Sequence, residues 1–298
     1  MKEKIKLGTR GSSLALAQAN QVIAALHKRF PDVEIETVVL RTQGDKILDR
    51  PLLDFGGKGA FITEFEEAIS EGRIDLAVHS AKDMPAELGD GLVIAGALPR
   101  ADARDVLVTR KGVDGLRIVG TGSLRRQCQL SSLCPGVICK GIRGNVPTRL
   151  MKLRSGEYDG LVLAAAGLKR LGLLHEEDLE YRFFSLDEMV PAGGQGIIAV
   201  EGRKGDGTTD MIAEISDSRA YAELALERNV LEIFNAGCHE AVGVISECRR
   251  DSVCIRIVRE VDGQVLKLNR SVGAMEGRRL AEEMAHSMTG FTRGDFNG

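Results

Sequence analysis

The chain has 298 residues, with 40 Lys and Arg against 43 Asp and Glu and a formal net charge of −3. This length favours two or three domains, because single hydrophobic cores rarely grow much past about 250 residues. A hydrophobic content of 43% and a charged content of 28% exclude a wholly disordered chain, and the balanced charge argues against bulk nucleic-acid binding. No apolar run approaches the roughly 18 residues that span a bilayer and no signal-peptide core is present, so we expect a cytoplasmic protein without membrane contact.

The cysteine pattern argues against a metal or redox motif. None of the six cysteines forms a Cys-x-x-Cys pair, the spacing typical of zinc ligands and thioredoxin-like sites. We therefore expect no metal, and reduced thiols in a cytosolic chain. The cysteines are Cys128, Cys134, Cys139, Cys238, Cys248 and Cys254.

The first third of the chain alternates predicted strands and helices. A helix is expected over 12–30, capped by Ser12 or Ser13, and a second over 61–69. A glycine-rich passage covers 44–59. This β-α-β-α order predicts a largely parallel sheet between helices. The strands of this part are expected over 5–8, 35–40 and 74–78.

The same rhythm continues to about residue 200, and then the texture changes. Helices are expected from about Leu124, over 145–154 and over 166–171. A long helix over 218–234, three strand-like runs and a final helix over 275–288 then predict a small α+β domain. The strands of the two parts are expected over 105–109, 117–119, 137–139, 161–165, 197–200, 241–245, 253–258 and 265–268.

Arginines at loop–helix junctions are the strongest chemical signal. A guanidinium group can hold a carboxylate or phosphate through two hydrogen bonds, and helix N-termini add free N–H groups. Ligands of α/β sheets bind beyond the carboxyl ends of the strands, where these residues fall, so the set predicts a polyanionic ligand in a cleft. The alternative is that they cover solvated helix faces. The set comprises Arg10, Arg125, Arg126, Arg143, Arg149 and Arg170, with Lys58 and Lys82 in similar places.

Two glycine-containing motifs are similar to nucleotide-binding loops only superficially. The stretch 120–125 lacks the third glycine of a dinucleotide fingerprint, because Arg125 stands in its place. The stretch 56–59 lacks the spacing of a P-loop, and Ala60 takes the place of Ser or Thr. The sequence therefore argues against a nucleotide cofactor, and 56–59 is better interpreted as a lid segment.

Asp83 and Cys238 are the residues best suited to proton and covalent chemistry. Asp83 follows Lys82 at a strand end, and a carboxylate among cations can stay ionised and still exchange a proton. Its alternative role is to cap the turn before Pro85. Cys238 follows Gly237 after the long helix, and His239 could lower the pKa of its thiol. Its alternative role is that of a buried apolar filler.

Taken together, these segments resemble the porphobilinogen deaminase family, also called hydroxymethylbilane synthases. The most specific stretches are Val-His-Ser-Ala-Lys-Asp at 78–83 and Gly-Thr-Gly-Ser-Leu-Arg-Arg at 120–126. The matching stretches follow the family's order over nearly the whole chain. They are 9–12, 56–61, 77–85, 120–130, 143–150, 164–172 and 194–196.

The resemblance implies an α/β fold with two lobes similar to periplasmic binding proteins around a central cleft, and a small C-terminal α+β domain. The first lobe would comprise 1–97 and 192–215, the second 98–191, and the third domain 216–298. The family polymerises four porphobilinogen units to hydroxymethylbilane with release of ammonia, in the biosynthesis of tetrapyrroles (haem, sirohaem and corrinoids). A monomer is implied, with no nucleic-acid partner and with a transient hand-off to uroporphyrinogen-III synthase.

The resemblance also assigns roles to residues. Asp83 would be the catalytic carboxylate, and a dipyrromethane cofactor would be attached covalently through the sulfur of Cys238. The residues implied to hold the cofactor are Lys82, Asp83, Thr121, Ser123, Arg125 and Arg126. Those implied to bind substrate or growing chain are Arg10, Lys58, Phe61, Arg143, Asn145, Arg149, Arg170 and Gln195.

Two residues depart from the family's pattern, and one rival function stays open. Ala236 stands where the family has glycine, and Gly122 where serine is common. If residue 236 needs a positive φ, alanine costs about 1 kcal/mol there. The rival is a non-catalytic two-lobed binding protein for a polycarboxylate ligand, for which Asp83 and Cys238 would have no use.

Overall fold

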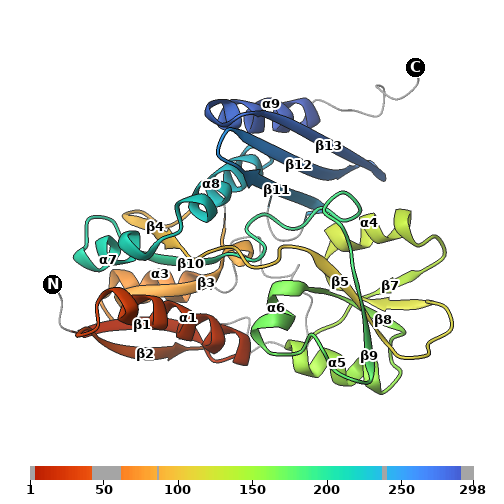
Figure 1. The fold of residues 1–298 in the computed structure, drawn as a ribbon, viewed down its shortest axis with the longest axis horizontal. Helices are drawn as coiled ribbons and strands as arrows, with labels where there is room; N and C mark the ends of the chain where they lie inside the picture. The colour runs from red at the N-terminus through yellow and green to blue at the C-terminus, as the bar shows by residue number, and fades with distance from the viewer. Residues whose placement is uncertain (1–3, 42–61, 86, 237–239, 290–298) are drawn as a thin grey trace. The chain divides into compact units, whose positions relative to one another are not determined.

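The structure is a computed structural model that describes residues 4–41, 62–85, 87–236 and 240–289. Contacts divide the chain into two compact units, one of residues 1–101 with 196–222 and the other of 102–195 with 223–298. The first unit holds one sheet and the second unit holds two (Figure 1). The division into three domains with boundaries after residues 97, 191 and 215, and the cleft between two lobes, stay predictions.

The first unit is built on a mixed five-stranded sheet in the order β2-β1-β3-β10-β4. Strand β1 pairs in parallel with β2 and β3, whereas β10 runs antiparallel to β3 and β4. Because β10 is antiparallel to both β3 and β4, the other four strands run in one direction, so the sheet is largely parallel, as expected, and β10 is the exception. The chain enters β10 from residues 102–195 of the other unit and not through a crossover helix, which parallel neighbours require. The strands are β1 (Lys4–Arg10), β2 (Glu34–Leu40), β3 (Leu76–Ser80), β4 (Leu92–Ala97) and β10 (Ile198–Arg203).

Among the described residues, three helices cover this sheet. Helices α1 (Ser13–Arg29) and α7 (Gly207–Ile215) bury their apolar sides against one face, in a cluster that includes residues of β1, β3 and β10. Helix α3 (Thr63–Ser70) packs against the opposite face, on Ile74 and Ala77. Ser12 caps α1, as predicted, because its Oγ accepts the N–H of Ala15 at 3.2 Å.

The second unit repeats this plan with a sheet in the order β7-β6-β8-β5-β9. Strand β5 is antiparallel to both of its neighbours, whereas β6 is parallel to β7 and β8. Helix α4 (Leu124–Leu133) covers one face, and α5 (Val146–Arg154) and α6 (Ala165–Arg170) cover the other. The strands are β5 (Asp105–Arg110), β6 (Ile118–Gly120), β7 (Ile138–Lys140), β8 (Gly160–Ala164) and β9 (Leu179–Phe183).

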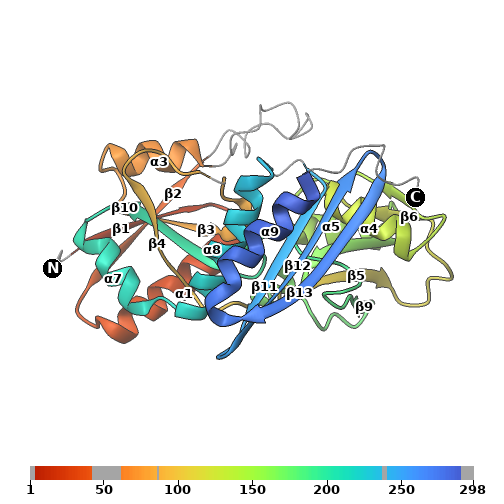
Figure 2. The same cartoon turned by 90° about the horizontal axis from the view of Figure 1, so that it is seen from above.

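A three-stranded antiparallel sheet completes the second unit. Strands β11 (Val242–Cys248), β12 (Ser252–Val261) and β13 (Gln264–Gly273) follow α8 (Ser218–Ile233) and precede α9 (Gly277–Thr289). Figure 2 shows α9 lying against this sheet, and residues of α8 and α9 share one core with it. Two α/β parts and a C-terminal α+β part confirm the expected fold class. None of the helices in the described part of the chain combines the length and hydropathy of a membrane span.

Candidate active site

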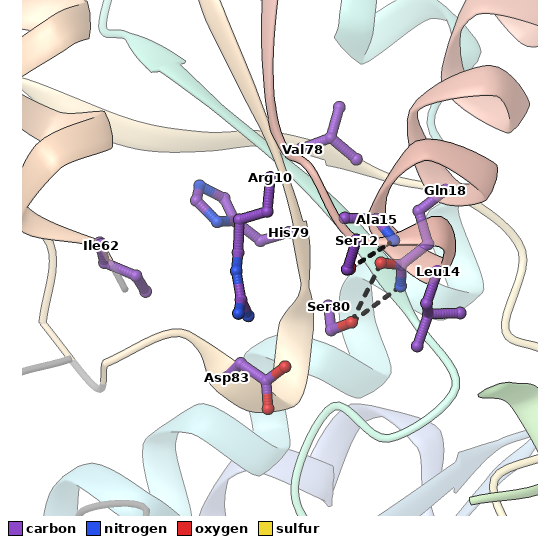
Figure 3. A pocket seen from close by; sticks show the side chains of 10 residues that line it. All are labelled: Arg10, Ser12, Leu14, Ala15, Gln18, Ile62, Val78, His79, Ser80 and Asp83. Atoms are coloured by element: carbon purple, nitrogen blue, oxygen red, sulfur yellow. Dashed lines mark hydrogen bonds between the residues drawn. The ribbon is translucent and has the colours of Figure 1, made fainter. Parts of the chain in front are cut away.

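A pocket of about 80 Å³ opens where β1 and β3 end, in the first unit (Figure 3). Parallel neighbours bring their carboxyl ends to the same edge of a sheet, so the residues that follow β1 and β3 converge there. The sequence predicted this position for Arg10 and Asp83. The lining residues are Arg10, Ser12, Leu14, Ala15, Gln18, Ile62, Val78, His79, Ser80 and Asp83.

Asp83 supplies the carboxylate of this pocket. After β3 the chain turns through a 3-10 helix, Ala81–Asp83, closed by the N–H of Met84 on the carbonyl of Ala81 at 3.2 Å. The turn leaves Asp83 exposed, with half-buried Lys82 beside it in the chain. Figure 3 shows the guanidinium group of Arg10 pointing toward the carboxylate of Asp83. The pocket therefore offers its ligand both a carboxylate and a guanidinium group.

Gln18 is a pocket residue that the sequence analysis did not identify. It lies on α1 with 3% of its surface exposed, and its Nε2 donates to the Oγ of Ser80 at 2.8 Å. In the other direction the Ser80 hydroxyl reaches the Oε1 of Gln18 at 3.2 Å. A signal was available, since Gln18 is polar and follows Leu14 by one helical turn, on the side of α1 that faces the sheet.

His79 forms part of the pocket wall, and its imidazole contacts the buried carboxylate of Glu201. Its Nε2 lies 2.8 Å from the Oε2 of Glu201 on β10, and Glu201 is fully buried. The ring of Phe65 meets the imidazole edge-on, with 5.2 Å between ring centroids. Burial raises the pKa of Glu66, which lies on α3 and accepts the N–H of Gly89 at 2.9 Å.

Arg125 and Arg126 lie inside the second unit, on a shared carboxylate. Nη1 of Arg125 is 2.8 Å from Oδ2 of Asp105, and Nη2 of Arg126 is 2.7 Å from Oδ1. The same guanidinium groups donate to the carbonyls of Val190 and Val162 at 2.7 and 2.9 Å. The arginines therefore begin α4 next to the predicted turn, but they form a buried ion-pair cluster and do not lie on a solvated face.

The charged groups of this cluster shift the pKa values of Asp105 and Arg125. Burial alone would raise the pKa of Asp105, but the two arginines overcome it and hold that pKa well below its ordinary value. Burial lowers the pKa of Arg125, against the opposing effect of Asp105. The amide Nε2 of Gln195 donates to Oδ1 of Asp105 at 3.0 Å and to the carbonyl of Ala103 at 2.6 Å. Gln195 thus stabilises the cluster, and its contact with substrate stays a prediction.

The remaining predicted ligands of the second unit lie at ends of strands and helices. Asn145 caps α5, since its Oδ1 accepts the N–H of Thr148 at 2.9 Å. The Nε of Arg149 donates to the carbonyl of Gly144 at 2.7 Å. Arg143 and Arg149 are half-buried, and burial lowers the pKa of Arg170, at the end of α6, to about 10. Their contacts with substrate stay predictions.

The turn before α4 is partly buried. Thr121 is 1% exposed, and its Oγ1 accepts the N–H of Ser123 at 3.2 Å. A Cβ added at Gly122 would lie 3.6 Å from the carbonyl oxygen of Ile142, an ordinary contact, so the serine common in the family would fit. Contacts of Thr121 and Ser123 with the cofactor stay predictions.

The end of α8 resolves the question about Ala236. The positive φ of this turn, 51°, belongs to Asn235 and not to Ala236. Asparagine tolerates this left-handed conformation and commonly ends helices in it. Ala236 therefore carries no such strain. Three predicted site residues, Lys58, Phe61 and Cys238, lie outside the described residues.

The matching family model and the sequence relatives agree on one family. Residues 5–211 match the family model described as "Porphobilinogen deaminase, dipyromethane cofactor binding domain". The "Porphobilinogen deaminase" of Roseiflexus castenholzii is 43% identical over 296 residues, which cover 95% of this chain and 96% of that one. The protein of the same name from Acetivibrio thermocellus is 40% identical over 289 residues, 96% of this chain and 98% of that one.

Solved structures align more loosely. The periplasmic VFT2 domain of Bordetella pertussis BvgS is 14% identical and covers 76% of this chain and 92% of its own, with a TM-score of 0.45. The sequence relatives, by contrast, align along nearly the full chain. Since the family model also spans both five-stranded sheets, the chain belongs to the porphobilinogen deaminase family and is a transferase.

Proposed function

We propose that this chain joins four porphobilinogen units head to tail to give hydroxymethylbilane, with one ammonia released per unit, at the pocket that holds Asp83. The observation that carries the proposal is the exposed carboxylate of Asp83 at the strand ends, with the guanidinium group of Arg10 pointing toward it. Family membership supports this substrate and favours an enzyme over the non-catalytic binding protein.

Asp83 acts on the charge that deamination creates. When the C–N bond of the substrate's protonated aminomethyl group breaks, its electron pair leaves with ammonia, and the positive charge remains on the methylene carbon and the pyrrole nitrogen. A fixed carboxylate stabilises this charge most at the moment it develops. The same group can accept a proton from the pyrrole nitrogen and return it. Arg10 binds a substrate carboxylate.

The cofactor proposed for this chain is a dipyrromethane, attached through the sulfur of Cys238. Each of its pyrrole rings carries an acetate and a propionate, and the donor set fits such a group. Arg10 and Lys82 flank Asp83 in the first unit, and half-buried arginines end or begin helices in the second. When bound, the group supplies the pyrrole carbon at which the new chain starts. Lys82, Thr121 and Ser123 would help to hold it.

Further parts of the proposal follow from the same family. Arg143, Arg149 and Arg170 bind carboxylates of substrate and growing chain, and Lys58 and Phe61 contribute from the segment before α3. The protein is a cytoplasmic monomer that hands its product to uroporphyrinogen-III synthase. Sedimentation of the purified protein alone tests whether it is a monomer. Sedimentation together with that synthase tests whether the two proteins bind each other.

Ammonia release in a single turnover tests the role of Asp83. Asp83→Asn keeps the shape but removes the charge and the proton acceptor, so release from cofactor-bearing protein should slow by a factor on the order of 10²–10⁴. Asp90→Asn, which changes an exposed carboxylate of the same unit, is the control and should release ammonia at the wild-type rate. Wild-type release by Asp83→Asn would move the acid–base role to another residue.

Intact mass tests the attachment. The wild-type chain should carry a two-pyrrole adduct, and Cys238→Ser should lack it, because the thioether needs the sulfur. Cys254→Ser, on β12, is the control and should keep the adduct. An adduct that survives in Cys238→Ser would show that another side chain holds the cofactor.

A further inference from the structure

A second carboxylate lies directly behind the Asp83 pocket. Glu201 on β10 is fully buried, and its Oε2 is 2.8 Å from Nε2 of His79, which forms part of the pocket wall. The register pairs His79 with Ala199, so Glu201 is the diagonal neighbour of His79, two residues further along β10. Side chains two residues apart on a strand share one face, which brings the two groups together.

The stability of the fold does not by itself explain why a glutamate is buried at position 201. Burying a carboxylate costs free energy unless hydrogen bonds compensate for the lost water. Within the part of the chain that the structure describes, Oε1 of Glu201 is buried without a hydrogen-bond partner, so the contact to His79 is its compensation. The neighbouring residues on this face, Phe65 and Ala77, are buried and apolar. An apolar side chain at 201 would satisfy this core, and a buried carboxylate whose partner is a pocket residue therefore points to the pocket.

We infer that Glu201 is a positioning residue for the reaction: its carboxylate holds the imidazole of His79 in one orientation with a proton on Nε2. An ionised carboxylate only accepts hydrogen bonds, so the nitrogen that faces it must donate. Buried carboxylates fix ring orientation and tautomer in this way in other imidazole sites. This inference rests on the proposed function, because the pocket is the place where His79 would affect turnover.

Other charged groups around His79 provide the matched control. Asp83 and Arg10 line the same pocket, and Glu66 approaches from α3. Glu66 is a second acid near the ring, but its Oε1 accepts the N–H of Gly89. Glu66→Gln keeps that acceptor and removes a nearby charge. It should leave the Nε2 proton in place and turnover within about twofold of wild type.

Nitrogen NMR of the ¹⁵N-labelled, cofactor-bearing protein measures whether Nε2 of His79 carries a proton. A purely structural role of Glu201 would not change this protonation. The His79 signals are assigned by their loss in His79→Gln. In wild type and Glu66→Gln, Nε2 should carry a proton. In Glu201→Gln the side-chain amide can donate as well as accept, so Nε2 should be unprotonated in part or all of the molecules.

Kinetics complete the test. In Glu201→Gln, kcat should fall on the order of 10- to 100-fold, with KM for porphobilinogen nearly unchanged. An unprotonated Nε2 in the wild type would overturn the inference even if Glu201→Gln failed to fold. Wild-type kcat in a folded Glu201→Gln would overturn it too. This test is independent of the role proposed for Asp83. If Asp83→Asn released ammonia at the wild-type rate, the role of Asp83 would be wrong, but the protonation of Nε2 in His79 would still test the inference about Glu201.

Discussion

Asp105→Asn should strongly destabilise the second unit. The substitution keeps the shape of the side chain but removes the negative charge that two guanidinium groups share at 2.8 and 2.7 Å. Removing one partner of a buried ion pair typically costs about 3–5 kcal/mol, because the other charge is left uncompensated. Here Arg125 and Arg126 are both left, with the carbonyls of Val190 and Val162 as their other partners. We therefore expect the upper part of that range, about 4–5 kcal/mol.

Urea unfolding of wild type and variant at neutral and mildly acidic pH measures this loss. The pKa of Asp105 in the folded protein lies below its unfolded value of about 3.9. Its contribution is therefore fully present above that value and is lost as pH falls through the folded pKa. The difference between the two proteins should be equal at about pH 7 and about pH 5, and should shrink only below about pH 4.

Asp102→Asn is the matched control. Asp102 pairs with Arg104 at 2.7 Å, but both side chains are partly exposed, and such surface pairs contribute at most about 1 kcal/mol. A loss below about 1 kcal/mol in Asp105→Asn, or one equal to that of the control, would refute the buried-charge argument.

Three further predictions concern the pocket and the arginines. Gln18→Leu removes the partner of Ser80 and should lower kcat/KM roughly 3- to 10-fold, the effect of one hydrogen bond; unchanged kinetics would remove Gln18 from the site. In Arg149→Leu, partly elongated chains should accumulate on the enzyme, as measured by mass spectrometry; a wild-type mass pattern would show that Arg149 stabilises only helix α5. Since the pKa of Arg170 is about 10, KM for porphobilinogen should rise as pH passes 10, and Arg170→Leu should lack this rise.

Local patterns were enough to predict most elements. The cap of Ser12 on α1 and the turn that presents Asp83 after β3 depend on a few neighbouring residues, so the sequence contains the whole signal. Strand β4 was missed, because Leu-Val-Ile-Ala-Gly-Ala includes small residues that lower strand propensity. A packing contact explains its glycine: a Cβ at Gly96 would lie 2.8 Å from the Cβ of Ser216, the residue that ends α7. That contact joins residues 120 apart, and no local pattern predicts it.

Strand direction also depended on distant parts of the chain. Strands β5 and β10 each follow the passage of the chain from one unit to the other, and each runs antiparallel to both neighbours. Sequence periodicity identifies a strand but carries no information about its direction. Strand β9 and helix α7 were missed as well.

Long-range partners also change how the arginines should be interpreted. From the sequence, each arginine at a helix end counts equally as a binder of anions, since nothing near Asp105 predicts a contact with residues 20 and 21 positions later. In the structure Arg125 and Arg126 already share that buried carboxylate. A ligand carboxylate that reaches them has to share them with Asp105, so the two arginines and Asp105 together carry one net positive charge instead of two. Neutralising the acetate and propionate groups of a lengthening chain therefore depends mainly on the other arginines. These are Arg10, Arg143, Arg149 and Arg170.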